Sequence, residues 1–245
     1  SGIVGAQAVK AAPADGYTLM FTISTTMIMN RVTYKSLPYD ADKDFVLISS
    51  MTSGGLIFVV QKSLGISKLA DFFEYSKKNK AVYGTYAAGS GSHVVITELN
   101  KQFGANVDIV HYRGEGPMWQ DFNAGVIQAV CGSYPPTRPI LDGGNGVPLA
   151  IWGPKRMRKL PDVPTFKEIG ATSKVFDLQG FVCLVGPTGM PAEAIDKLSA
   201  LMVEAGKSPR VAALLESNGI DEAAKGKDDF RKLYDFEKPI WIELV

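Results

Sequence analysis

The ten residues Gly84-Thr85-Tyr86-Ala87-Ala88-Gly89-Ser90-Gly91-Ser92-His93 separate two segments of different character. The apolar run 81–83 before them is typical of a strand, and the pattern of residues 94–103 after them is typical of a helix. The stretch therefore predicts a strand that ends in a loop of small and hydroxylic residues, where a helix begins. Backbone N–H groups and hydroxyls at the positive end of a helix dipole are suited to bind an anion.

The same order of strand, polar loop and helix recurs along the chain. Expected strands at 17–23, 107–112 and 126–132 lead into polar loops at 24–26, 113–117 and 133–136. This alternation predicts an α/β fold with mainly parallel sheets, whose ligands bind in loops at the carboxyl ends of strands. The candidate ligand-binding residues in these loops are Ser24, Thr25, Thr26, Thr85, Tyr86, Ala87, Gly89, Ser90, Ser92, His93, Arg113, Ser133 and Tyr134.

Length and charge limit the class of protein. The chain has 245 residues, which allows one large or two modest domains. Its 26 Lys and Arg nearly balance 25 Asp and Glu, and this argues against a nucleic-acid binder that works through surface charge. The sequence contains no apolar run long enough to predict a membrane span. It begins at Ser1 without Met, so the lack of a visible signal peptide says nothing about secretion.

The cysteines and histidines predict neither a metal site nor a cofactor. Cys131 and Cys183 lie inside apolar runs without metal-ligand spacing, so we expect buried free thiols. A single disulfide is the alternative in an oxidising compartment. The two histidines, His93 and His111, are too few and too scattered to suggest a metal centre.

Enzyme signatures are weak around the opening stretch. Gly84 and Gly89 have P-loop spacing, but Ser90-Gly91 follows where a nucleotide site needs lysine. No nucleophile elbow surrounds Ser90 or Ser92, and adjacent Ser92 and His93 point in different directions. A hydrolase using these residues is one alternative. A simple helix-capping role for each hydroxyl is another.

Six segments in order resemble a single family. They match the patterns "AxPDGYTL" at 11–19, "LPYDxxxDF" at 37–45, "YGSxGxGSxxH" at 83–93, "PYKGxxP" at 112–117, "LPDVPT" at 160–165 and "APAGTP" at 186–191. The chain therefore resembles the Bug family, also called TctC, the substrate-binding proteins of tripartite tricarboxylate transporters.

This resemblance implies a periplasmic, two-lobed binding protein of the type II-like, Venus-flytrap kind, and not an enzyme. The expected ligand is a small organic carboxylate (di-, tri- or aromatic), held by loop backbone and hydroxyl groups and delivered to membrane transporter subunits.

We expect a monomer with lobe 1 at 1–61 and 177–245, lobe 2 at 62–176, and crossings near 61–63 and 176–179. Loops 24–26 and 84–93 would face each other across the cleft. A ligand-sensing module for signalling on the same fold is the alternative.

The chain also departs from the family pattern. The family's first strand and its "PxxPGGxxD" loop are missing from lobe 1 in this sequence. Either upstream residues have been removed, or this is a shortened member whose carboxylate site is incomplete. Cys131-Gly132-Ser133 stands where many members carry Phe-Asp, so we expect no acid at that strand end. Tyr86, Tyr134 and Trp119 are possible aromatic walls, which suggests a less polar ligand.

Overall fold

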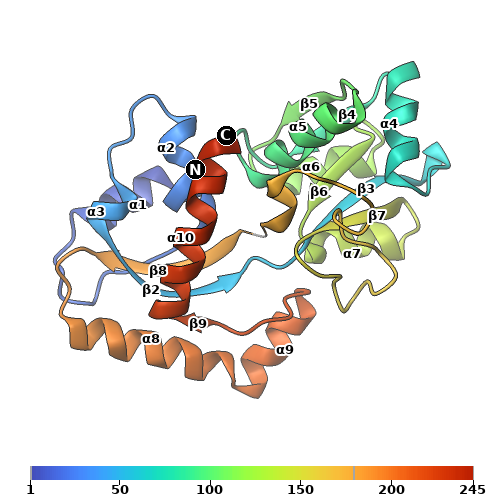
Figure 1. The fold of residues 1–245 in the computed structure, drawn as a ribbon. Coiled ribbons are helices and arrows are strands. Elements are labelled where there is room, and N and C mark those ends of the chain that lie inside the picture. The colour runs from blue at the N-terminus through green and yellow to red at the C-terminus, as the bar shows by residue number, and fades with distance from the viewer. Residues whose placement is uncertain (1, 179, 245) are drawn as a thin grey trace. The chain divides into compact units, whose positions relative to one another are not determined.

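The computed structural model describes residues 2–178 and 180–244, which fold into two compact units (Figure 1). Unit 1 consists of Ser1–Ser53, Gly180–Glu216 and Glu222–Val245, and unit 2 consists of Gly54–Gln179 and Ser217–Asp221. Strand β3 (Leu56–Gln61) pairs with strands of unit 2, so it belongs there, whereas the sequence analysis assigns it to lobe 1. The expected crossing at 176–179 includes Gln179, which lies outside the described residues.

Unit 1 is built on a four-stranded sheet in the order β1-β8-β2-β9. Every neighbouring pair in this sheet is antiparallel. Its strands are β1 (Met20–Ile23), β2 (Phe45–Thr52), β8 (Phe181–Pro187) and β9 (Lys225–Gly226). Its helices are α1 (Ile3–Lys10), α2 (Asn30–Thr33), α3 (Ala41–Asp44), α8 (Ala192–Gly206), α9 (Pro209–Ser217) and α10 (Lys227–Leu244).

Helix α10 covers this sheet with an apolar stripe. Phe230, Tyr234 and Trp241 recur at helical spacing and are buried, because that spacing places them on one face. The ring of Phe230 meets that of Phe181 on β8 edge-on, with centroids 5.2 Å apart. Packing of this kind ties the C-terminal helix to a strand far away in the sequence (Figure 1).

Unit 2 is built on a five-stranded sheet in the order β5-β4-β6-β3-β7. Strand β4 pairs in parallel with β5 and β6, and β3 pairs antiparallel with β6 and β7. Besides β3, its strands are β4 (Val82–Thr85), β5 (Asp108–His111), β6 (Ala129–Gly132) and β7 (Gly146–Trp152). Its helices are α4 (Leu69–Lys78), α5 (Gly91–Phe103), α6 (Glu115–Asn123) and α7 (Tyr134–Asp142).

The α/β class is confirmed, but the prediction of mainly parallel sheets is wrong. Strands β1 and β2 run in the same direction, yet β8 runs between them in the opposite direction. The reason is the path of the chain, which leaves unit 1 after β2 and re-enters it through β8. Only the run β5-β4-β6 follows the parallel strand-helix-strand pattern.

The start of α5 is fixed by close packing on Trp152. A Cβ atom on Gly91 would lie 2.2 Å from the Trp152 ring, so only glycine allows this approach. The indole N–H of Trp152 donates to the carbonyl of Val175 at 2.7 Å, which holds the ring in place. The position of the helix N-terminus is therefore set by contacts within the core of unit 2.

Two further expectations concern the cysteines and the membrane. Cys131 and Cys183 are both buried and free, which confirms the prediction of free thiols. Burial raises the pKa of both thiols well above its usual value. Within residues 2–178 and 180–244, no helix is both long and apolar enough to cross a membrane.

Candidate ligand-binding site

The loop between β4 and α5 forms a well-capped helix N-terminus. Gly89 has a φ of +68°, a left-handed conformation that suits glycine and turns the chain into the helix. Ser90 is the N-cap residue, and its hydroxyl accepts from the N–H of His93 at 3.4 Å. The same hydroxyl donates to the carbonyl of Ala87 at 2.7 Å. The predicted strand, loop and helix are thus all present at residues 84–93.

A tyrosine of the same loop lies at this helix N-terminus. The Ser92 backbone and the Ser90 hydroxyl both act to lower the pKa of the Tyr86 phenol. Burial and then the Glu115 carboxylate raise the pKa of Tyr86, which outweighs those two effects. The phenol therefore stays protonated at neutral pH.

Ser92 points into the core of unit 2. Its side chain is fully buried, and its hydroxyl shares a 2.8 Å hydrogen bond with the Tyr83 phenol. Neither Ser92 nor Ser90 hydrogen bonds to a histidine ring within the described chain. The arrangement therefore gives no support to a serine nucleophile activated by His93.

The two histidines lie side by side at the outer edge of this loop. Their rings meet edge-on with centroids 4.6 Å apart. Nδ1 of His93 accepts from the N–H of Gly89 at 3.1 Å, so a neutral ring carries its proton on Nε2. Nδ1 of His111 shares a 2.9 Å hydrogen bond with the hydroxyl of buried Thr85. Burial and then His111 lower the pKa of His93.

Arg113 lies on the neighbouring loop, after β5. The N–H of Tyr112 donates to the carbonyl of Thr85 at 2.8 Å, and the N–H of Gly114 donates to the carbonyl of Tyr86 at 2.9 Å. These bonds hold the two loops together. Arg113 is exposed, and its guanidinium has no hydrogen bond or ion pair with any part of the chain that the structure describes. Its charge is therefore available to an anion beside the start of α5.

The start of α7 resembles that of α5 in sequence but has different partners. The hydroxyl of Ser133 donates to Oε2 of Glu115 at 2.7 Å, and its N–H donates to the same carboxylate at 3.1 Å. Pro135 and Pro136 follow, and they carry no N–H to offer. Of the predicted residues in this loop, Ser133 therefore has an acceptor inside the protein, and Tyr134 is partly buried.

The hydroxyl cluster of unit 1 begins a π-helical turn, Thr25–Met29. Ser24 and Thr26 are buried, whereas Thr25 is partly exposed. The Thr26 carbonyl accepts from the phenol of Tyr39 at 2.6 Å. A sequence prediction of a simple capped helix misses this turn, because π-helical geometry depends on such tertiary contacts.

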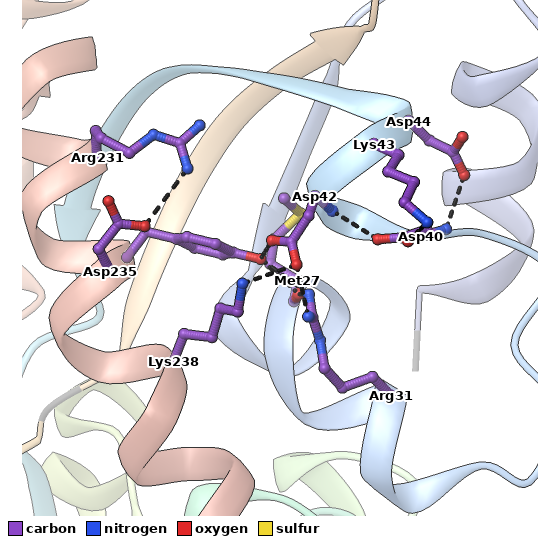
Figure 2. A network of polar contacts seen from close by, with 10 residues as sticks. Met27, Arg31, Asp40, Asp42, Lys43, Asp44, Arg231, Asp235 and Lys238 are labelled. Carbon is purple, nitrogen blue, oxygen red and sulfur yellow. Dashed lines mark hydrogen bonds and ion pairs between the residues drawn. The ribbon is translucent and has the colours of Figure 1, made fainter.

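A polar network supports the same turn (Figure 2). Arg31 donates to the carbonyl of Met27 at 3.0 Å and to Asp42 at 2.8 Å, and Tyr234 and Lys238 from α10 also donate to Asp42. Burial alone would raise the pKa of Asp42, but the hydrogen bonds from Arg31, Lys238 and Tyr234 hold it well below its usual range. Through Arg31 and Asp42, this network connects the π-helical turn to helix α10.

The remaining charged and hollow features do not form a second candidate site. In the basic segment 155–159, Arg156 pairs with Glu168 at 2.9 Å and Arg158 with Asp221 at 2.8 Å. Among the described residues there is no cluster of three or more His, Cys, Asp or Glu side chains that could hold a metal ion. A surface hollow on α8 and the start of α10 contains none of the predicted ligand-binding residues.

Sequence analysis missed two residues that shape the loops of unit 2, Glu115 and Tyr83, and it gave Trp119 only as a possible aromatic wall. The sequence carries no acid directly after β6, as expected, but the carboxylate of Glu115 reaches Ser133 there from the first turn of α6. The indole N–H of Trp119 donates to the same carboxylate at 3.4 Å. The only sequence signal was an acidic residue at a helix start, which usually indicates nothing more than a favourable dipole contact.

The fold and the capped loops define a class, the two-unit α/β binding proteins. Within that class, the sequence matches the tripartite tricarboxylate transporter family receptor, TctC, over residues 1–241. The chain belongs to this family of receptors.

Individual relatives agree with this assignment. The chain is 26% identical to protein BugT of Bordetella pertussis over 247 residues, which cover 100% of this chain and 75% of BugT. Rpa4515 of R. palustris, solved with adipate, has a TM-score of 0.89 and 25% identity, over 99% of this chain and 81% of that one. MatC of Rhodopseudomonas palustris, solved with malate, has a TM-score of 0.83 and 24% identity, over 99% of this chain and 84% of that one.

Proposed function

We propose that this chain is a periplasmic receptor that binds a small organic carboxylate and delivers it to the membrane subunits of a tripartite tricarboxylate-type transporter. The observation that carries the proposal is the exposed Arg113 guanidinium, without a partner in the described chain, on a loop hydrogen-bonded to the start of α5. Membership of the receptor family and the adipate bound to Rpa4515 support it.

In this proposal the carboxylate accepts hydrogen bonds from the first-turn N–H groups of α5. A helix start favours negative charge, and the Ser90 cap keeps the turn in place. Arg113 supplies the opposite charge, and the neutral phenol of Tyr86 adds no repulsion at this helix start. These groups replace the water that hydrates the free carboxylate, and the neutral donors allow its release.

The other predicted residues have different parts in this proposal. Thr85, Ala87, Gly89 and His93 shape the loop, and Ser92 acts only through its backbone, because its hydroxyl is bonded to Tyr83. The residues of unit 1, Ser24, Thr25 and Thr26, stay a prediction from the sequence.

Calorimetric titration against mono-, di-, tri- and aromatic carboxylates, with hydroxy acids among the monocarboxylates, tests the proposal. Arg113→Gln is expected to weaken the best ligand by about 10- to 100-fold, since a charge-assisted hydrogen bond contributes about 1.5–3 kcal/mol. Arg210→Gln is the matched control, because Arg210 is an exposed arginine of unit 1 outside the site. Flat titrations with every carboxylate would contradict the proposal, and so would equal losses in the two variants.

A further inference from the structure

Glu115 places a carboxylate group among the loops where the ligand is proposed to bind. Its Oε1 and Oε2 both lie within 3.2 Å of the Ser133 backbone nitrogen, and Oε2 also accepts from the Ser133 hydroxyl and from the indole of Trp119. All of these donors are neutral. No lysine or arginine in residues 2–178 and 180–244 forms an ion pair with Glu115, so no ion pair neutralises its negative charge.

The Glu115 carboxylate has hydrogen-bond acceptor capacity that the described residues do not fill. Oε1 accepts only from the Ser133 N–H, at 3.2 Å, although a carboxylate oxygen can accept two hydrogen bonds. The side chain is partly exposed. The neighbouring Gly116 is open, since a Cβ atom there would have no heavy atom within 4 Å. Glu115 can therefore accept one further hydrogen bond from a ligand.

Glu115 also lies close to the proposed carboxylate-binding groups. The N–H of the preceding residue, Gly114, donates to the carbonyl of Tyr86 at 2.9 Å, which places Glu115 beside the loop before α5. In the sequence it is two residues after Arg113, which precedes the first turn of α6. This face of unit 2 therefore combines one available cation with one anion, a pattern that suits a ligand with an acceptor at one end and a donor at the other.

The start of α7 cannot offset the negative charge. Glu115 already accepts from the N–H and hydroxyl of its N-cap residue, Ser133. Pro135 and Pro136 remove the next donors, so Tyr134 alone contributes a free N–H in that segment of the turn. A second carboxylate of a ligand would meet the charge of Glu115 here with only the Tyr134 N–H as a compensating donor.

We propose that Glu115 is a specificity-determining residue that selects a carboxylate ligand bearing a hydroxyl, amine or amide donor and rejects a second carboxylate. The inference rests on the proposed function, because it concerns the ligand of the same site. Two like charges about 5 Å apart at an effective dielectric constant of about 20 repel enough to change affinity by about 100-fold. The hydrogen bond to Oε1 adds to the discrimination.

The test compares pairs of ligands in which a hydroxymethyl group replaces the second carboxylate. Three pairs with different carbon skeletons cover three ligand lengths. The pairs are 4-hydroxybutyrate and succinate, 6-hydroxyhexanoate and adipate, and 4-(hydroxymethyl)benzoate and terephthalate. Dissociation constants are measured by calorimetry for the wild type, Glu115→Gln and Asp71→Asn. The glutamine keeps the shape and an acceptor for Ser133, and Asp71→Asn removes one charge from an exposed position on α4 of the same unit.

We expect the wild type to bind the hydroxy acid of the best pair at least about tenfold more tightly than the diacid. Glu115→Gln should move this ratio toward the diacid by about 10- to 100-fold, and Asp71→Asn should leave it unchanged. A wild type that prefers the diacid overturns the inference, and so does a ratio that Glu115→Gln does not move. The wild-type ratio needs no variant, so the inference can fail even if Glu115→Gln unfolds. If the wild type binds no carboxylate at all, the proposed function fails and this inference fails with it.

Discussion

Helices α5 and α7 begin at the ends of two adjacent parallel strands, β4 and β6, and both have a serine as N-cap residue. The backbone of Ser90 has φ −79° and ψ 164°, and that of Ser133 has φ −72° and ψ 159°. Ser90 caps its own helix, whereas the hydroxyl and N–H of Ser133 both donate to Glu115. The same N-cap residue therefore begins one turn that can receive an external anion and one turn that already holds an internal carboxylate.

The comparison teaches that an N-cap serine identifies a helix start but not its ligand. What decides the outcome is the composition of the first turn and the side chains that reach it. The first turn of α5 begins with Gly91 and Ser92 and keeps its N–H groups, whereas that of α7 contains Pro135 and Pro136. Each prediction below changes one of these features.

The largest expected effect comes from removing the internal carboxylate. Glu115→Ala leaves the Ser133 N–H, the Ser133 hydroxyl and the Trp119 indole without their acceptor, at a cost of about 2–4 kcal/mol in the free energy of unfolding. Glu115→Gln should lose about 1 kcal/mol, because the amide oxygen can still accept. Urea denaturation at pH 7 measures both values. Equal stability of the alanine variant and the wild type would mean that α7 does not depend on the contact.

Packing at the start of α5 gives the next effect. Gly91→Ala places a Cβ atom against the Trp152 ring, and overpacking of this kind costs about 1–3 kcal/mol. Gly5→Ala in α1 is the matched control, since the nearest heavy atom outside its helix is the Met20 sulfur at 4.0 Å. The control should be neutral or stabilising by about 0.5–1 kcal/mol, as expected for glycine to alanine in a helix. Thermal unfolding of the two variants separates the effects, and a loss of equal size in both would contradict the packing argument.

Much of the fold follows from local patterns. The segments 56–61 and 91–103 are recognisable from apolar periodicity and from the Ser90 cap, and they are β3 and α5 in the structure. The direction of the strands in unit 1 is not local. It depends on β8 inserting between β1 and β2 after the chain has passed through unit 2, which no periodicity records.

The candidate site also has features that are local in the sequence and features that depend on tertiary packing. The loop 84–93 and its capped helix follow from the sequence, because a cap acts over three residues. The partner of Ser133 does not, since Glu115 is 18 residues away and reaches it only through the placement of α6 against α7. The orientation of Ser92 toward Tyr83 is likewise a consequence of helix packing.

A smaller effect is expected from the two serine caps themselves. Ser90→Ala removes the acceptor of the His93 N–H and should cost about 1 kcal/mol. Ser133→Ala should cost less, because Glu115 still accepts from the Ser133 backbone and from Trp119. Denaturant titration of both variants gives the difference. If Ser133→Ala is the more harmful change, the Ser133 hydroxyl contributes more to the stability of α7 than the Ser90 cap contributes to that of α5. The contrast between the two helix starts is then lost.

The smallest effect is a pH dependence confined to α5. Burial and then His111 lower the pKa of His93 from its usual 6.5, so the folded state binds fewer protons than the unfolded state just below that pH. The stability of the wild type is therefore complete above about pH 6.5 and decreases as the pH falls through the folded pKa. His93→Asn cannot titrate, and its amide oxygen can take the place of Nδ1 as acceptor for Gly89.

The measurement is the melting temperature of both proteins between pH 7.5 and 5.5, compared as a difference so that other titrating groups cancel. The wild type should lose more stability over this interval than His93→Asn, by a few tenths of a kcal/mol because the ring is only partly buried. Parallel curves would mean that His93 is protonated equally in the folded and unfolded states. Since His93 accepts from Gly89, a confirmed difference would also show that the turn before Ser90 loosens on acidification, whereas the start of α7 contains no histidine and should not respond.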